Sequence, residues 1–357
     1  MTAARPSSTR ARPEPAAPSR RVHGRARRVA WSLAAVAAVL GVLVAGTLIG
    51  SLPLSSTAVV DALSGRGDVE ARTILFDQRI PRTVLAAAGG AALAMAGVVI
   101  QAHTRNPLAD PGLLGISAGA SLLVVVAIAF LGATTPVDFV WFALLGAAAA
   151  TTLVAALGRL AGSRRDSSPA TLVLAGSAVA AVLSAVTGVI LLTSSSTLDL
   201  FRFFTVGSLS GEHDLAALLP GFVCIAVGAV LALAQAPTLD ALALGDDLVT
   251  ALGRNVVRAR LVGLVSVTLL TAGAVICCGA IGFVGLVVPH LVRLLVGRTH
   301  SWLLPMSAAI GAVAVVAADV AGRVVARPTE VPVGVVVALL GAPVFLAIVV
   351  SFRSRTR

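Results

Sequence analysis

The sequence predicts an all-α, polytopic membrane protein with about ten transmembrane helices. Of the 357 residues, 57% are hydrophobic and 12% are charged, and the mean hydropathy is +0.98; soluble domains carry about 25% charged residues. A single core cannot bury this much apolar surface, so the bilayer must be its solvent. Apolar blocks recur along nearly the whole chain, without the alternating segments of about ten residues that mark an outer-membrane barrel.

Ten apolar segments are each close to the roughly 20 residues that a helix needs to cross about 30 Å of hydrocarbon. The eighth is short, which leaves its boundaries the least defined. An even number of spans places both chain ends on the same side of the membrane. In chain order the predicted spans are 29–50, 82–103, 112–132, 139–160, 169–193, 213–235, 260–280, 283–297, 302–321 and 332–351.

Both ends of the chain are predicted to be basic tails. Residues 1–28 are rich in Pro, Ser and Arg and include eight arginines, so we expect a disordered cytosolic tail that cannot bury enough apolar surface to order itself. One transmembrane domain over 29–352 follows, and 353–357 form a second basic tail. A twin-arginine or cleaved signal peptide is the alternative for the N-terminus, but the first apolar run is too long for one and lacks a convincing cleavage site.

The placement of arginines predicts the orientation. All 27 basic residues are arginines. With the N-terminus in the cytosol, 20 of them lie in cytosolic segments and 7 lie outside, as the positive-inside rule requires. Heavy use of Arg, Ala, Val and Gly is typical of high-GC bacterial genomes. We therefore expect a multi-pass protein of the bacterial cytoplasmic (inner) membrane, with both termini cytosolic.

The predicted spans are rich in small residues, as in AAAGGAALAMAG (86–97) and AGAVICCGAIG (272–282). Small residues let helix backbones approach closely where lipid supplies no hydrophobic drive, so a tightly packed bundle is expected. Cys224, Cys277 and Cys278 lack partners at zinc or disulfide spacing. We interpret them as small core hydrophobes.

Several kinds of catalytic chemistry are missing from the sequence. A P-loop needs a lysine, and the chain has none, so it cannot bind ATP by a P-loop of its own. The zinc-protease H-E-x-x-H and hydrolase G-x-S-x-G motifs are also absent. The run GEHD (211–214) resembles metal ligands only faintly and fits a polar span cap better. We predict that the chain is not an enzyme and holds no metal.

Asp319 is one of the few ionisable residues inside a predicted span, and an ion-coupled carrier needs such a group. Arg323 lies four residues further on, where it can pair with Asp319 on the same helix face. A local ion pair at a helix end is the favoured interpretation, and an ion-coupled secondary transporter stays as an alternative from a different functional class.

Six stretches of the sequence together carry a resemblance to one family. They are RIPRTVLAAAGGAALAMAGVVIQ (79–101), RNPLADPGLLGISAGAS (105–121), ALALGDDLVTALGRNV (241–256), GAIGFVGLVVPHLVRLLVG (279–297), ADVAGR (318–323) and PTEVPVGVVVALLGAPVFL (328–346). They resemble the FecCD-type permeases, the membrane subunits of iron–siderophore, haem and vitamin B12 ABC importers. The resemblance runs in order from about residue 30 to 352, and the second and fourth stretches are the most specific. It implies a ten-helix fold like that of the vitamin B12 importer permease.

The resemblance also implies the partners. They are a second permease subunit in a homo- or heterodimer, two ATP-binding ATPase subunits on the cytosolic face, and an extracytoplasmic binding protein that delivers substrate. ATP and Mg would be bound by the ATPase, with no cofactor on this chain and no nucleic acid involved.

Segment 239–258, LDALALGDDLVTALGRNVVR, lies between the sixth and seventh predicted spans. In the family this loop forms two short coupling helices broken at a glycine. Glycine can terminate a helix, and aspartate is favourable at a helix N-terminus. A solvated linker is the alternative. The residues implied to contact the ATPase are Gly245, Asp246, Asp247, Leu252 and Gly253.

Arginines on the outer side run against the positive-inside bias and need a reason. Arg79, Arg82 and Arg323 match arginines that pair with glutamates of the binding protein in the vitamin B12 member. Guanidinium groups suit bidentate carboxylate pairing and steer docking. The alternative is interfacial snorkelling.

The stretch RNPLADPGLLG (105–115) joins the second and third predicted spans. Pro107 and Pro111 disfavour helix at the residues before them. The resemblance implies that Asn106, Pro107 and Leu108 form a cytosolic gate-side turn near the translocation path, and a merely structural turn is the alternative.

The loop before the fifth span is the family's other gate element, and Ser168, Pro169 and Ala170 align with it. Pro169 and Ala170 replace hydroxyl residues of the vitamin B12 member, which weakens the match. The run TLDLFRFFTVGSLSG (197–211) is expected to form a short amphipathic surface helix, with Phe201, Phe203 and Phe204 as interfacial anchors.

Taken together, these features predict the permease subunit of a binding-protein-dependent ABC importer that carries a ferric siderophore across the cytoplasmic membrane. Siderophores are the commonest cargo of the family, which is the reason for preferring them. Cobalamin or haem import is the alternative within the family. An intramembrane enzyme is the most distant alternative, because no nucleophile–base or metal constellation is visible.

Overall fold

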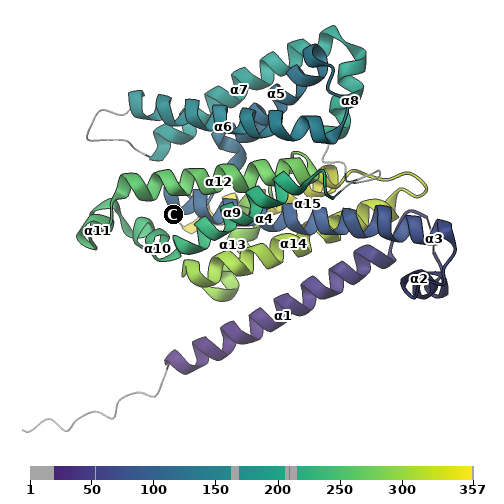
Figure 1. The fold of residues 1–357 in the computed structure, drawn as a ribbon. Helices are drawn as coiled ribbons and strands as arrows, with labels where there is room; N and C mark the ends of the chain where they lie inside the picture. Colours follow the sequence, from purple (N-terminus) through teal and green to yellow (C-terminus); the bar gives the residue numbers. More distant parts are fainter. Residues whose placement is uncertain (1–19, 53, 162–168, 206–208, 210–214, 356–357) are drawn as a thin grey trace, which may run out of the picture.

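The computed structural model describes residues 20–52, 54–161, 169–205, 209 and 215–355, and the regular secondary structure within these ranges is helical (Figure 1). This confirms the predicted all-α class. Among the described residues, six helices are long and apolar enough to span a membrane. Helix Leu219–Ala234 passes the same test only together with Ala236–Leu244, which is bent from it by 58°, and three further apolar helices are shorter.

These elements match the ten predicted spans in order. They are α1 (Arg20–Leu48), α4 (Ile80–Thr104), α5 (Ile116–Leu131), α6 (Pro136–Ala161), α7 (Pro169–Thr193), α9 (Leu219–Ala234), α12 (Val256–Cys278), α13 (Val284–Val296), α14 (His300–Val325) and α15 (Val333–Arg355).

Shorter helices connect the spans. A π-helical turn leads directly into α4, and a 3₁₀ turn precedes α5. The predicted surface helix before the sixth span is present as α8, and the remainder of 197–211 contributes only Leu209 to the described residues. These elements are α2 (Ser56–Leu63), α3 (Val69–Thr73), the π-helical turn Ile74–Arg79, the 3₁₀ turn Pro111–Leu114, α8 (Ser195–Thr205), α10 (Ala236–Leu244) and α11 (Asp246–Ala251).

The first helix begins earlier than predicted. We expected a disordered tail through residue 28, but α1 starts at Arg20. Pro18 is the last proline before the span, and the Arg and Ala residues after it are good helix formers. Residues 20–28 therefore extend the span as a basic first part of its helix.

Helix α4 lies at the centre of the bundle and packs against α12, α13 and α14 (Figure 1). Glycines on α4 allow backbone contact. A Cβ atom on Gly90 would lie 2.3 Å from the carbonyl oxygen of Gly311, and one on Gly97 would lie 1.9 Å from that of Gly285. Real Cβ atoms do not come this close, so these helices pack at this distance only because glycine occupies the contacts. The small residues of the predicted spans thus serve the expected tight packing.

The same device recurs in a second group of helices, α5, α6, α7 and α8, which lie together on one side of the bundle (Figure 1). A Cβ atom on Gly119 of α5 would lie 2.3 Å from the carbonyl oxygen of Gly146 on α6. A Cβ atom on Gly146 would lie 2.1 Å from the carbonyl oxygen of Gly119. The contact between α5 and α6 is therefore also made backbone to backbone.

The eighth span is short because part of the crossing is not helical. Cys278, the last residue of α12, contacts Gly89 of α4, whereas Gly285, at the start of α13, contacts Gly97. These two positions on α4 are separated by about 12 Å along the helix axis. The intervening residues 279–283 cover this depth without regular helix. Non-helical backbone is tolerated at membrane depth where it is buried in protein or lines a cavity. In this segment Ile281 is buried and Gly282 is exposed.

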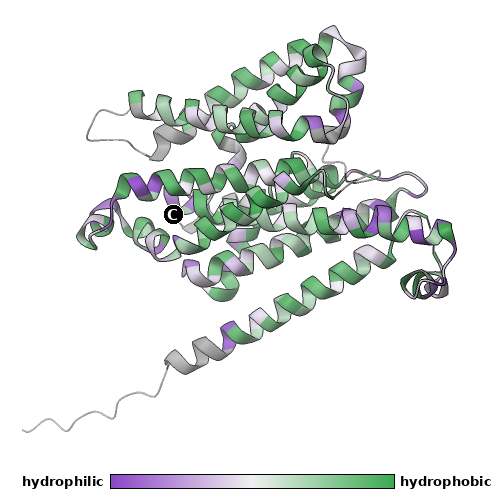
Figure 2. Ribbon diagram, in the orientation of Figure 1, coloured by the Kyte–Doolittle hydropathy of each residue, from purple (hydrophilic) through white to green (hydrophobic). Residues whose placement is uncertain are grey.

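Helix α1 lies at the edge of the bundle and presents an apolar stripe. Leu33, Val36, Leu40 and Val44 are spaced along one face and are 56–66% exposed. Figure 2 shows apolar residues along the long helices and polar residues gathered mainly at their ends. This distribution fits a bundle whose outer surface is solvated by lipid chains.

The backbone contact at Gly90 can be tested with Gly90→Leu. We expect a lower melting temperature for the detergent-purified chain, because overpacking costs about 1–3 kcal/mol. Melting can be followed with a thiol-reactive dye, since Cys277 and Cys278 are 4% and 1% exposed in the folded chain. Gly41→Leu is the control, because nothing lies within 4 Å of a Cβ atom built there. Equal melting temperatures for the two variants would contradict the packing argument.

Candidate functional site

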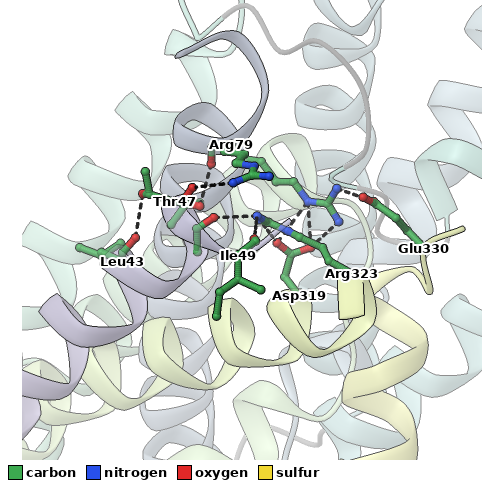
Figure 3. Close-up of polar contacts among 10 residues, drawn as sticks. Leu43, Thr47, Ile49, Arg79, Asp319, Arg323 and Glu330 are labelled. Atoms are coloured by element: carbon green, nitrogen blue, oxygen red, sulfur yellow. Dashed lines mark hydrogen bonds and ion pairs between the residues drawn. The ribbon is translucent and has the colours of Figure 1, made fainter. Parts of the chain in front are cut away.

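Polar side chains concentrate at the two ends of α4. One group, called the arginine cluster here, comprises Arg79, Arg82, Asp319, Arg323 and Glu330 (Figure 3). The other, called the loop junction, lies at the opposite end of α4, where the turn 105–115 meets α10, α11 and α12.

Asp319 is the centre of the arginine cluster and is fully buried. Arg82 donates from Nε to both carboxylate oxygens, at 3.0 and 3.1 Å, and from Nη2 to Oδ1 at 2.7 Å. Arg323 of the same helix donates to Oδ2, so the ion pair predicted between Asp319 and Arg323 is confirmed. Arg82 also reaches Glu330 through Nη1, at 2.5 Å. One carboxylate thus joins α4 to α14.

Arginines also bind the end of α1, which sequence reasoning missed. Arg79 donates to the carbonyl oxygens of Leu48 and Leu52, at 2.7 and 2.5 Å. Arg323 donates to Gly46 at 2.7 Å. A helix leaves its last carbonyls without intrahelical donors, and cations are stabilising at that end of the helix dipole. The cluster therefore caps α1 and attaches it to the bundle.

A further arginine extends this cap, because Arg327 donates to the carbonyl oxygen of Gly50 at 2.8 Å. A Cβ atom on Gly50 would lie 2.6 Å from the guanidinium of Arg79. Glycine at this position lets the guanidinium lie against the backbone.

The three arginines predicted to dock a binding protein are enclosed in this structure. Arg79, Arg82 and Arg323 are 4%, 8% and 1% exposed, and each donates to groups within the chain. Their docking role stays a prediction. A partner's carboxylates would have to replace contacts that these guanidiniums already make.

The turn 105–115 leaves the α-helical conformation, as its prolines predict: residues 105–110 are irregular, and Pro111–Leu114 form a 3₁₀ turn. Arg105 ends α4 in a left-handed conformation, with φ 49°. The side chain of Asn106 accepts a hydrogen bond from the backbone N–H of Leu108 at 2.9 Å, and that of Asp110 accepts from Gly112 at 2.8 Å. Both bonds are of the local kind that favours turns over helix. Asn106 is exposed, and Pro107 and Leu108 are half-buried.

Gln101 holds the far end of this turn, and it was not among the predicted site residues. Its Nε2 donates to the carbonyl oxygens of Ala109 and Gly285, at 3.2 and 3.1 Å. Its Oε1 accepts from Arg293 at 2.5 Å. The available signal was a single amide side chain near the end of an apolar span, because a buried amide needs partners.

The coupling-loop segment forms two short helices broken at a glycine. Helix α10 ends at Gly245, with φ +136°, and α11 is followed by Gly253, with φ +69°. Both values are easy for glycine and unfavourable for other residues. Leu244 and Leu252 are 77% and 59% exposed. The predicted helix–glycine–helix form is therefore present and exposes leucines at the end of the bundle.

Asp246, the first residue of α11, contacts two arginines, whereas the neighbouring Asp247 is exposed and makes no ion pair within the described part of the chain. Arg260 of α12 donates to Asp246 Oδ2 at 2.6 Å, and Arg105 donates to Oδ1. Arg105 also donates from Nε to the carbonyl oxygen of Leu242 at 2.9 Å. These contacts make up the loop junction.

Other predicted residues are only partly described. Ser168 lies outside the described residues, and Pro169 and Ala170 open α7 without a described side-chain environment. Phe201, expected as an interfacial anchor, is 5% exposed and packs into the core. The side chains of Phe203 and Phe204 are not described.

Metal ligands do not converge in the described ranges, where no three His, Cys, Asp or Glu side chains are grouped to hold an ion. The predicted GEHD cap lies outside those ranges. The cysteines fit the interpretation as small core residues, because Cys277 and Cys278 are buried and Cys224 is partly buried.

Comparisons with known proteins agree on one family. Residues 36–351 match the model of the FecCD transport family. The chain is 40% identical to the ferric enterobactin transport system permease protein FepD of Escherichia coli (strain K12), over 87% of this chain and 91% of that protein. It is 36% identical to the cobalamin import system permease protein BtuC of Halobacterium salinarum, over 90% and 96%.

A solved structure shares the fold. It is described as an inward-facing conformation of an ABC transporter of metal-chelate type, and it matches with a TM-score of 0.77 and 28% sequence identity. The match covers 89% of this chain and 98% of that chain.

The role of Asp319 in the arginine cluster can be tested with Asp319→Asn. The change leaves two buried arginines without their shared carboxylate, and breaking a buried ion pair costs about 3–5 kcal/mol. We expect a large drop in the melting temperature followed with the thiol-reactive dye. Asp199→Asn is the control, because its pair with Arg202 is 66–70% exposed and such pairs contribute about 0–1 kcal/mol. An unchanged melting temperature for Asp319→Asn would show that the cluster does not hold the bundle together.

Proposed function

Because the chain belongs to the FecCD transport family, we propose that it is the permease subunit of a binding-protein-dependent ABC importer and that its cargo is a ferric siderophore. The observation that supports a siderophore as the transported substrate is the 40% identity to a ferric enterobactin permease over 87% of the chain. Cobalamin and haem remain the alternatives within the family, since relatives named for both match nearly as well.

The partners follow from this role. The chain forms half of a permease dimer with a second permease subunit, homo- or heteromeric. Two ATPase subunits bind ATP and Mg, and an extracytoplasmic protein delivers the cargo, while this chain binds no cofactor of its own. Binding protein and ATPase drive alternating access by each preferring one state of the permease.

An ion-coupled carrier that uses Asp319 has little support. Both carboxylate oxygens accept hydrogen bonds from arginines. A coupling carboxylate has to bind and release its ion during transport. The fully buried Asp319 instead joins two helices.

The proposed location is the bacterial cytoplasmic membrane, with both termini in the cytosol. The arginine distribution supports it, with 20 arginines on the side of the termini and 7 on the other. In this orientation the loop junction faces the cytosol and the arginine cluster lies toward the outer surface.

The proposed ATPase contact is the exposed surface of α10 and α11, around Gly245, Asp246, Asp247, Leu252 and Gly253. Leu244 and Leu252 on this surface are 77% and 59% exposed, and apolar residues of this kind mark protein interaction sites. The turn 105–115, beside this surface, is the proposed gate element, together with residues 168–170.

The proposed binding-protein contact is the outer surface around Arg79, Arg82 and Arg323. Glu330 is the most exposed of the carboxylates that these arginines meet, with a side chain 21% exposed. A carboxylate of the binding protein could replace Glu330 on Arg82 with little burial of new charge. Docking would then exchange one ion pair for another.

The function is tested first by growth of a strain that lacks this gene on a panel of ferric siderophores, haem and cobalamin. We expect loss of growth on one ferric siderophore, restored by the wild-type gene. Loss of growth confined to haem or to cobalamin would show that this compound, and not a siderophore, is the transported substrate. Uptake that survives deletion of the ATPase gene but collapses with an uncoupler would overturn the importer assignment.

The ATPase contact is tested with Gly253→Trp. We expect substrate-stimulated ATP hydrolysis by the assembled importer to fall about tenfold, a typical size for coupling between sites, with unchanged membrane insertion. Gly132→Trp is a matched control, because Gly132 directly follows the last residue of α5 and lies outside the coupling loop. Both glycines have φ near +70° and no atom within 4 Å of a built Cβ, so local strain is equal. If Gly253→Trp and Gly132→Trp lowered ATP hydrolysis equally, the proposed ATPase contact at Gly253 would be contradicted.

The docking surface is tested with Arg82→Glu. We expect weaker binding of the loaded binding protein, with the largest loss at low salt, where charge attraction is least screened. Arg72→Glu, an exposed arginine on α3, makes the same charge change as a control. The melting temperature of each variant shows whether lost binding reflects lost folding. Unchanged binding and an unchanged salt dependence in a folded variant would rule out the role.

A further inference from the structure

The coupling-loop helices are connected to the turn 105–115 through Arg105, which pairs with the carboxylate of Asp246 on α11 and donates to the carbonyl oxygen of Leu242 on α10. We propose that Asp246 is a positioning residue that transmits movement of α10 and α11 to this turn, and so links the partner ATPase to the gate. The inference rests on the proposed function. It assigns the link to Asp246 and its two arginines, rather than to the loop as a whole.

The two carboxylate oxygens of Asp246 accept hydrogen bonds from arginines that belong to two different spans. Oδ1 accepts from Arg105, the residue that ends α4, and Oδ2 accepts from Arg260 of α12 at 2.6 Å. Arg105 at the same time donates to the last turn of α10, through the carbonyl oxygen of Leu242 at 2.9 Å. Both short helices therefore meet the same guanidinium.

The guanidinium of Arg105 acts directly on the turn. Arg105 has φ 49°, a left-handed conformation that is unfavourable for a residue other than glycine. A conformation of this kind persists only where surrounding contacts maintain it. Asn106, the first residue of the gate-side turn, follows at once. If α11 moves, the contact that maintains Arg105 changes, and the turn can relax.

The turn is held at its other end by a separate set of bonds. Gln101 donates to the carbonyl oxygens of Ala109 and of Gly285 at the start of α13. Movement at Arg105 therefore bends residues 106–108, because position 109 is fixed against α4 and α13. This places the expected change on Asn106, Pro107 and Leu108.

The exposure of these groups suits a contact that changes during a cycle. The side chains of Arg105 and Asp246 are 36% and 38% exposed, and ion pairs in contact with water contribute little to stability. A second link from the loop, Asp240 on α10, accepts from the backbone N–H of His300 at 2.9 Å and leads to α14 instead. Removing Asp246 should therefore leave the loop attached and the chain folded.

The test measures the turn itself and needs no cargo. A cysteine introduced by Asn106→Cys is labelled with N-ethylmaleimide in the assembled importer, without nucleotide and after trapping with ATP and vanadate. The chain without this change gives the background from the three native cysteines. We expect the two states to differ in labelling rate by about fivefold or more. Asp246→Asn should abolish this difference, since the neutral side chain no longer pairs with Arg105 and Arg260.

Asp199→Asn is the control, because it removes the same charge from another exposed aspartate–arginine pair, on α8 and outside the proposed ATPase contact, and we expect it to keep the difference. Arg105→Gln should reproduce the loss, and combining it with Asp246→Asn should add nothing further, as for two partners of one interaction. A difference that persists in Asp246→Asn, an equal loss in Asp199→Asn, or no difference in the parent chain would each overturn the inference.

A separate cross-linking experiment tests the proposed ATPase contact independently of the role of Asp246. A photo-cross-linking amino acid placed at Leu252 should cross-link to the ATPase subunit in the parent chain and in Asp246→Asn. Absence of the cross-link in the parent chain would contradict the proposed contact. A cross-link in both, with normal labelling changes in Asp246→Asn, would contradict only the role of Asp246.

Discussion

Close approach of helix backbones to α4 fixes the positions of most other features of this chain. Lipid supplies no hydrophobic drive for helix association, so packing at van der Waals distance has to supply it. Gly90 and Gly97 permit that packing against α14 and α13. Arg82 lies near the start of this rigid helix and Arg105 follows its end. The geometry of both polar groups is therefore set by contacts in the apolar middle of the bundle.

The two polar groups differ in the way that their surroundings dictate. In the arginine cluster Asp319 is fully buried and Arg323 nearly so, and removal of one partner would leave an uncompensated charge. In the loop junction, Asp246 remains in contact with water, and solvent can replace its partners. The first arrangement suits a fixed joint among α1, α4 and α14. The second suits a contact that is made and broken.

Sequence patterns predicted those structural features that depend on the composition of short, continuous segments. Ten apolar segments, the tight packing of glycines, the turn at Pro107 and the Asp319–Arg323 pair all follow from neighbours within a few residues. The cap on α1, the bonds of Gln101 and the two partners of Asp246 join residues far apart in the chain, so no local pattern reveals them. The non-helical crossing at 279–283 was hidden for a related reason, because its composition is as apolar as that of a helix.

The four-residue spacing of Asp319 and Arg323 also bears on how the protein is made. A single charged residue in a helix raises the free energy of membrane insertion, by up to about 2.5–3.5 kcal/mol where it lies at the helix centre. Here the opposite charges lie one turn apart on α14 and can neutralise each other while this helix alone is entering the bilayer. Arg82 precedes Asp319 by 237 residues and has long been synthesised by then. The pair within α14 therefore lowers the cost of inserting this helix without a contact to α4, and Arg82 joins the pair when the helices assemble.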